Sequence, residues 1–225
     1  MKRNIIIATT AVAALIAGGT ATAVAVNGDD EPGGAQTSAQ LAAQDQSSIR
    51  VQDDDRDDND RDGGLEDLRE ARAAKVSAPD AAAAALKAVP GTVTELDLDE
   101  DRPGLVWDVD VLGQDNKWHD ITLDAGNARV LNHHIDHEDD DEHGQGYVRD
   151  QLKGAKTDAA GAARTAAAAH GTVTAVDLDD DYGPKAVWEV ETVTEDGTEH
   201  TVLVDPQSGK LTAAPAQDDG DDGDD

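Results

Sequence analysis

The chain contains no cysteine and no phenylalanine, and aromatic residues make up only 2% of its 225 residues. Without cysteine there is no disulfide framework, no zinc–thiolate site and no thiol nucleophile. Basic residues are also scarce, because 18 Lys and Arg stand against 49 Asp and Glu, for a formal net charge of −31. Nucleic acids and anionic lipid headgroups are bound mainly through Lys and Arg, so this charge argues against both as partners.

Charged residues are absent from the run between Ile5 and Val26, which follows Lys2 and Arg3 in the order of an export signal. The run is long enough to span a bilayer as a retained anchor. Small residues within 21–25 fit the A-x-A pattern of signal peptidase sites, and no cysteine is present to carry a lipid anchor. The sequence therefore predicts a cleaved signal peptide or a membrane anchor over 1–26, with the rest of the chain secreted or held outside the cytoplasmic membrane.

Apolar residues are too few for one large core, and they gather in 91–131 and 171–212. The stretches between them are rich in Asp, Gly, Gln and His, a composition typical of disorder. We predict a disordered acidic linker over 27–72, an acidic His-rich linker over 133–155 and an acidic tail over 215–225. Folded modules are expected over 73–132 and 156–214.

The two apolar clusters are copies of one another. Gly91-Thr-Val-Thr94 recurs as Gly171-Thr-Val-Thr174, and Val106-Trp-Asp-Val-Asp110 recurs as Val187-Trp-Glu-Val-Glu191. Agreement over this many positions indicates a tandem repeat of about 60 residues.

Each copy predicts a helix followed by strands. The Ala-rich stretches Pro79–Val89 and Ala159–His170 favour helices, with Ser77 and Thr157 as candidate N-caps. Three runs then alternate between apolar and polar residues, as strands with one buried face do. The predicted fold class is α+β: two tandem modules, each an Ala-rich helix packed on a small antiparallel β-meander.

The same alternation assigns faces to the central strand of each module. Trp107 and Trp188 are expected in the core, whereas four acids are expected on the solvated face, namely Asp108, Asp110, Glu189 and Glu191. Paired carboxylates can perform acid–base chemistry, but this needs a closed pocket that raises one pKa. A solvated acidic face is the simpler interpretation.

These features together resemble the PepSY domain family. The resemblance rests on the helix followed by Gly-Thr-Val-Thr, the two Trp-centred strands, and the segment Asp205–Leu211, which is similar to the family ending Asp-x-x-x-Gly-Lys-[Val/Leu]. The first copy has Ala128 where this ending has Gly209. The resemblance implies a noncatalytic protein without a cofactor, which binds and can inhibit or regulate an extracytoplasmic peptidase or another envelope protein.

Acidic and His-rich tracts suggest an alternative, an acidic extracellular protein that binds divalent cations. Residues 58–70 begin like a calcium loop, but Arg69 stands where a bidentate Glu should close it. Histidines 133, 134, 137 and 143 lie among acids, and His133 with His137 has the i, i+4 spacing of a metal pair on a helix. A disordered loop explains this tract equally well.

No residue is assigned as catalytic, cofactor-binding or metal-ligating from the sequence. The zincin motif is absent, because Asp141 follows His137-Glu138 where the second His would stand. His119 and His200 are equivalent in the two copies, which favours a packing role over a catalytic one. Nothing in the sequence fixes the oligomeric state.

Overall fold

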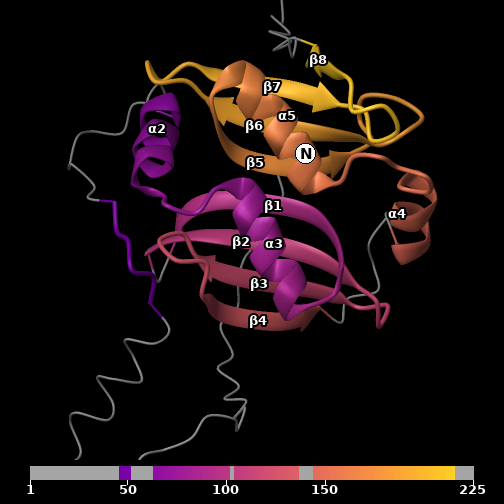
Figure 1. Ribbon diagram of the computed structural model, residues 1–225, viewed down its shortest axis with the longest axis horizontal. Coiled ribbons are helices and arrows are strands. Elements are labelled where there is room, and N and C mark those ends of the chain that lie inside the picture. The colour runs from indigo at the N-terminus through magenta and orange to yellow at the C-terminus, as the bar shows by residue number, and fades with distance from the viewer. Residues whose placement is uncertain (1–45, 52–62, 102–103, 137–143, 216–225) are drawn as a thin grey trace, which may run out of the picture.

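The computed structural model describes residues 46–51, 63–101, 104–136 and 144–215. The two modules of the predicted α+β fold join into one eight-stranded antiparallel sheet of order β4-β3-β2-β1-β5-β6-β7-β8, with two helices side by side across one face (Figure 1). The first module contributes β1 (Gly91–Asp101), β2 (Gly104–Gly113), β3 (Trp118–Asp124) and β4 (Val130–Asp136). The second contributes β5 (Thr172–Asp179), β6 (Val187–Val193), β7 (Glu199–Val204) and β8 (Leu211–Ala213).

The two covering helices are α3 (Ala78–Ala88) and α5 (Ala159–His170), close to the predicted ranges. Each buries four alanines at helical spacing: Ala78, Ala81, Ala82 and Ala85 in α3, and Ala159, Ala162, Ala163 and Ala166 in α5. These small side chains let the helices approach the sheet and one another closely. Ser77 occupies the N-cap position of α3 without a capping bond from its side chain. The cap of α5 is Asp158 rather than Thr157, and its Oδ1 accepts a 2.7 Å bond from the Gly161 amide.

Both predicted core tryptophans are buried, Trp107 on β2 and Trp188 on β6. The indole Nε1 of Trp107 donates to the Val76 carbonyl at 2.9 Å, and that of Trp188 donates to the Thr157 carbonyl at 3.0 Å. A buried indole needs such an acceptor. Because each acceptor lies just before a helix, each tryptophan fixes the position where its covering helix begins.

The modules meet where β1 pairs with β5. The paired residues are Glu95 with Asp177, Leu96 with Val176, and Asp97 with Ala175. Leu96 and Val176 are equivalent positions in the two copies, so a pseudo-twofold axis passes between them. The two copies therefore join as the protomers of a twofold dimer do, by the same strand from each.

Each meander has a fourth strand that the sequence did not predict, β4 or β8. The turn before it contains a residue with positive φ, Ala128 at 59° in the first copy and Gly209 at 69° in the second. Ala128 therefore keeps the turn that Gly209 makes in the second copy. The left-handed conformation is less stable for Ala than for Gly, because Ala has a Cβ atom.

The expected linkers are partly structured, which corrects the prediction for their described residues. Within 27–72, the helix α2 (Gly63–Ala73) packs on the sheet and residues 46–51 lie against the first module. Within 133–155, β4 continues to Asp136 and is followed by α4 (Gln145–Gln151). The signal or anchor at 1–26, residues 58–62 of the calcium-like loop and the tail beyond 215 lie outside the described residues, whereas residues 63–70 of that loop belong to α2. Among the residues described, no helix has the length and apolarity needed to cross a membrane.

Candidate functional site

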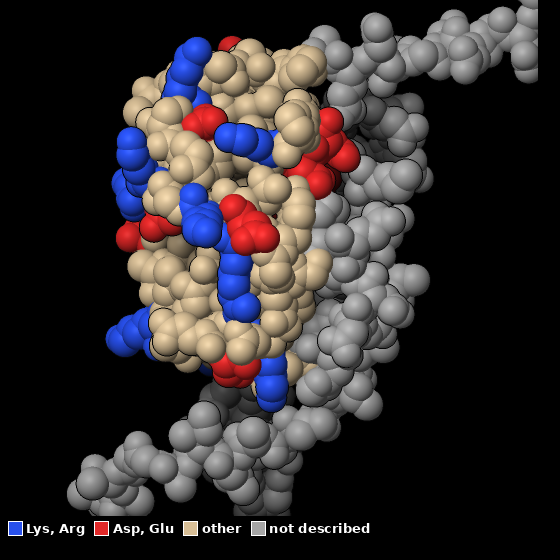
Figure 2. Space-filling view, turned by 90° about the vertical axis from the view of Figure 1, so that its right-hand side faces the viewer, with Lys and Arg blue, Asp and Glu red and all other residues tan. Residues whose placement is uncertain are grey.

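The sheet has two chemically opposite faces. One packs against α3 and α5, and the other carries a row of acids on adjacent strands, which we call the acidic face. Its members are Glu95, Asp97, Asp99, Asp108, Asp110, Asp120, Asp177, Asp179, Glu189 and Glu191. In the side view of Figure 2, Lys and Arg project mostly from the left and centre, while the largest group of Asp and Glu lies at the upper right. The four acids predicted for a solvated face all belong to this surface.

Asp110 on β2 is a carboxyl with a strongly raised pKa. It lies opposite Glu95 on β1 and Asp120 on β3, and its side chain is half-buried. Burial, the charges of Glu95 and Asp120, and a hydrogen bond with Asp120 raise the pKa of Asp110 to about 8. Two carboxyls that face one another avoid repulsion by holding one proton between them.

A second acidic pair flanks the pseudo-twofold axis. Partial loss of solvent and the charge of Asp99 raise the pKa of Asp97 to about 7. Partial loss of solvent and the charge of Glu95 do the same for Asp177. Asp97 and Asp177 are both exposed. The crowding of like charges at the axis is therefore the main cause of their raised pKa values. Joining two acidic strands edge to edge produces this crowding.

Helix α2 covers one end of the acidic face. Its Leu68 is buried, and Leu68, Ala71 and Arg72 line a shallow hollow with Val193 of β6. Glu70 is only 5% exposed and accepts a 3.2 Å bond from the Glu100 amide. Burial and the charge of Asp99 raise the pKa of Glu70 to about 8. The helix thus adds a further protonatable carboxyl to this face.

Raised carboxyl pKa values are a feature of acid–base catalysts, but geometry decides whether they can act as such. Two hollows of the described chain lie at the ends of strands, one beside Leu112 and Arg149 and the other beneath α2. Asp110 lines neither of these two hollows.

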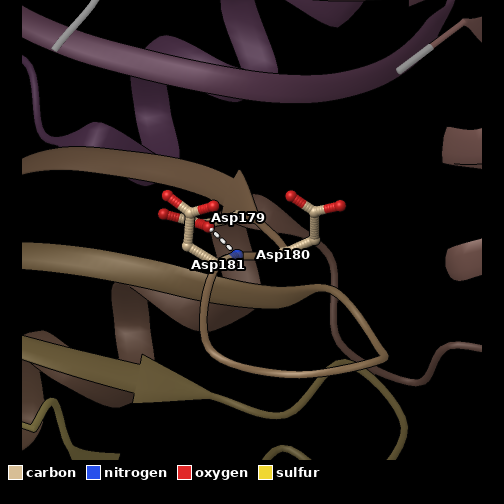
Figure 3. A group of neighbouring side chains, drawn as sticks. All are labelled: Asp179, Asp180 and Asp181. Carbon is tan, nitrogen blue, oxygen red and sulfur yellow. Dashed lines mark hydrogen bonds between the residues drawn. The ribbon is translucent and has the colours of Figure 1, made fainter. Parts of the chain in front are cut away.

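The turn after β5 carries three successive carboxylates, Asp179, Asp180 and Asp181, with ligand atoms within 4.8 Å of one another. Figure 3 shows the Asp179 and Asp181 side chains together, with Asp180 on the other side of the chain. The Asp181 amide donates to Asp179 Oδ1 at 2.6 Å, and the Tyr147 hydroxyl of α4 donates to Asp180 Oδ2 at 2.7 Å. These bonds explain the local turn and its tie to α4. Sequence reasoning did not single out this cluster.

A buried carboxylate in the first module, Asp124, anchors the segment 46–51. It is fully buried and accepts bonds from the amide of Ser48 at 3.0 Å and the amide of Gly126 at 2.8 Å. Burial opposes its ionisation, but these hydrogen bonds outweigh burial and hold the pKa of Asp124 below its usual range. The equivalent Asp205 is half-buried and bonds only within its own turn, to Ser208.

The histidines singled out in the sequence lie in different environments in the two modules. His119 is buried on β3 and His133 is exposed on β4, whereas His137 and His143 lie outside the described residues. His133 belongs to a strand, so its spacing from His137 is not that of a helical pair. His200 on β7 is half-buried and makes a tilted ring contact with His170 of α5, with centroids 5.1 Å apart and planes inclined by 47°. Both repeat-equivalent histidines, His119 and His200, take the packing positions that their equivalence predicted.

Comparison with known proteins identifies the modules. The family model described as "Peptidase propeptide and YPEB domain", PepSY, matches residues 75–134 and 160–214. The chain belongs to the PepSY family, with two tandem domains. No curated protein sequence matches significantly. Among solved structures, the crystal structure of a "putative lipoprotein" from Clostridium difficile 630 is similar at 23% identity and a TM-score of 0.39, over 62% of this chain and 91% of that chain. The matching family is described as a propeptide domain and not as an enzyme.

Proposed function

We propose that the chain is an exported, noncatalytic PepSY protein that binds an extracytoplasmic protein and, where that partner is a peptidase, inhibits or regulates it. The observation that carries the proposal is the match of both modules to a peptidase-propeptide domain. A propeptide acts by occupying the surface of its enzyme, so the residues needed are those of a recognition surface. The apolar run that follows Lys2 and Arg3 supports export.

Two surfaces of the folded chain are suited to such recognition. The acidic face offers charge complementarity to a basic partner, which speeds encounter and fixes orientation. The seven-residue strand β4 is at the edge of the described sheet, where an extended segment of a partner could add a further strand. Main-chain bonds at such an edge supply affinity that screened surface charges alone do not.

The test is affinity capture with the full mature chain from culture and envelope fractions, followed by direct binding of each purified candidate. We expect an extracytoplasmic protein that binds directly, and inhibition of its hydrolysis if it is a peptidase. Binding should survive 150 mM salt, with a slower association rate than at low salt. If no extracytoplasmic protein bound directly while calcium bound with submicromolar affinity, the proposal would give way to the cation-binding alternative.

A further inference from the structure

We infer that His119 and His133 form a binding site for a divalent transition-metal ion of the zinc and copper class at the β3–β4 edge of the first module. His119 Nδ1 lies 2.8 Å from His133 Nε2, and the ring centroids are 5.1 Å apart with planes inclined by 30°. The two histidines stand on neighbouring strands and on the same face of the sheet. Imidazole nitrogens are ligands that zinc and copper prefer.

The third member of the arrangement is Asp115, in the turn between β2 and β3. Its Oδ1 lies 3.0 Å from His119 Nε2. A carboxylate accepts from a ring N–H, so in the tautomer that donates from Nε2 to Asp115 the Nδ1 lone pair faces His133. A carboxylate behind a ligating histidine fixes the tautomer and orientation of the ring, as in many metal sites.

The two facing nitrogens are close to the spacing that a metal ion requires. Two metal–nitrogen bonds of about 2.0–2.1 Å at a tetrahedral angle place the nitrogens about 3.3 Å apart. The observed 2.8 Å therefore has to widen by about half an ångström when an ion replaces the shared hydrogen. His133 can provide this movement because it is exposed on an edge strand, whereas His119 is held by packing. The same exposure lets water fill the remaining coordination positions.

The second module provides an internal comparison. His200 and Asp196 stand where the first module has His119 and Asp115, but the position of His133 is occupied by Ala213. Asp196 binds Thr194 and Thr198 there and does not orient the histidine. The proposed site thus belongs to the first module alone.

Zinc titration of the full mature chain by calorimetry, with millimolar magnesium present to occupy exposed carboxylates, tests the inference. His133→Ala is the decisive variant, because its side chain is exposed and its removal should leave the fold intact. We expect it to weaken zinc binding at least tenfold, and Asp115→Asn to weaken binding about tenfold through the ring of His119. His134→Ala, on the next residue of the same strand, and His200→Ala are matched controls and should each change affinity less than twofold.

Electron paramagnetic resonance with copper as the probe gives a second readout that a loss of folding would not mimic. The native chain should show two equatorial nitrogens, and folded His133→Ala should show fewer. Three results would overturn the inference: no zinc binding by the native chain, unchanged affinity in His133→Ala, or an equal loss in His134→Ala. The last result would assign binding to the His-rich tract as a whole. None of these results bears on partner capture, so the two proposals fail separately.

Discussion

Replacing Asp110 by Asn should stabilise the protein at neutral pH. The half-buried Asp110 carboxyl has a pKa of about 8 in the folded protein, whereas the pKa of an unfolded Asp is 3.8. Folding at pH 7 must therefore bind a proton at this position. At 1.36 kcal/mol per pH unit, the free-energy cost has an upper bound of about 4 kcal/mol. An amide keeps a donor for Asp120 without needing that proton.

Solvent screening and the sharing of the proton with Asp120 reduce the bound, and we expect Asp110→Asn to gain about 1–2 kcal/mol at pH 7. For a chain of this size the midpoint temperature should rise by about 3–6 °C. The sign follows from linkage: between the unfolded and the folded pKa the native state binds more protons than the unfolded state, so stability falls as pH rises. Near pH 4, close to the unfolded pKa of 3.8, the unfolded carboxyl already binds part of a proton, so the gain should be much smaller than at pH 7.

Thermal and urea unfolding of native chain and variant at pH 4, 5.5, 7 and 8 would measure this effect. Asp150→Asn, on the exposed surface of α4, is the matched control for the loss of one negative charge. Destabilisation of Asp110→Asn at pH 7, or a gain at pH 4 as large as at pH 7, would refute the reasoning. A gain of equal size in Asp150→Asn would attribute the effect to net charge alone.

Three further predictions concern the supports of the fold, each measured by urea unfolding. Trp188→Ala should cost ~3 kcal/mol or more, because it empties a fully buried position and frees the Thr157 carbonyl; a change near zero would contradict core packing. Asp124→Ala should cost about 2–3 kcal/mol and make 46–51 sensitive to protease, while Asp205→Ala, at the equivalent but half-buried turn, should cost less; equal costs would contradict the anchoring role. Removing residues 1–73 should lower the midpoint below that of a chain lacking 1–62, because only the longer deletion takes away α2 and uncovers Val193; equal midpoints in these two chains would show that α2 adds nothing.

The repeat, and the period of the first three strands of each copy, could be predicted from the sequence because both depend on local pattern. Trp107 and Trp188 were correctly placed in the core by alternation alone. The sequence did not predict that α2 is an ordered helix, because this segment is acidic and only weakly apolar. Its position depends on packing against β6, where Leu68 and Val193 line the same hollow. No local period reveals an association between residues so far apart in the chain.

In the candidate sites, too, the features set by local pattern were predictable and those set by contacts between distant residues were not. Alternation predicted the outward direction of Asp108 and Asp110, but the raised pKa of Asp110 depends on which acids stand on the neighbouring strands. That register includes the β1–β5 pairing between the two copies, which the repeat alone does not specify. The pairing of His119 with His133 was hidden for a similar reason, because the second histidine lay in a segment whose composition indicated a disordered linker.

Joining the copies through β1 and β5 also determines which edges remain available. Two separate modules would expose four edge strands, whereas the fused sheet has two, and β8 has only three residues. An exposed edge invites pairing with other chains, so a protein benefits from keeping it short or charged. The longer edge, β4, carries both the proposed strand-addition surface and His133. Strand addition uses backbone groups and metal binding uses the His133 side chain, so His133→Ala should weaken metal binding at least tenfold while leaving strand addition intact.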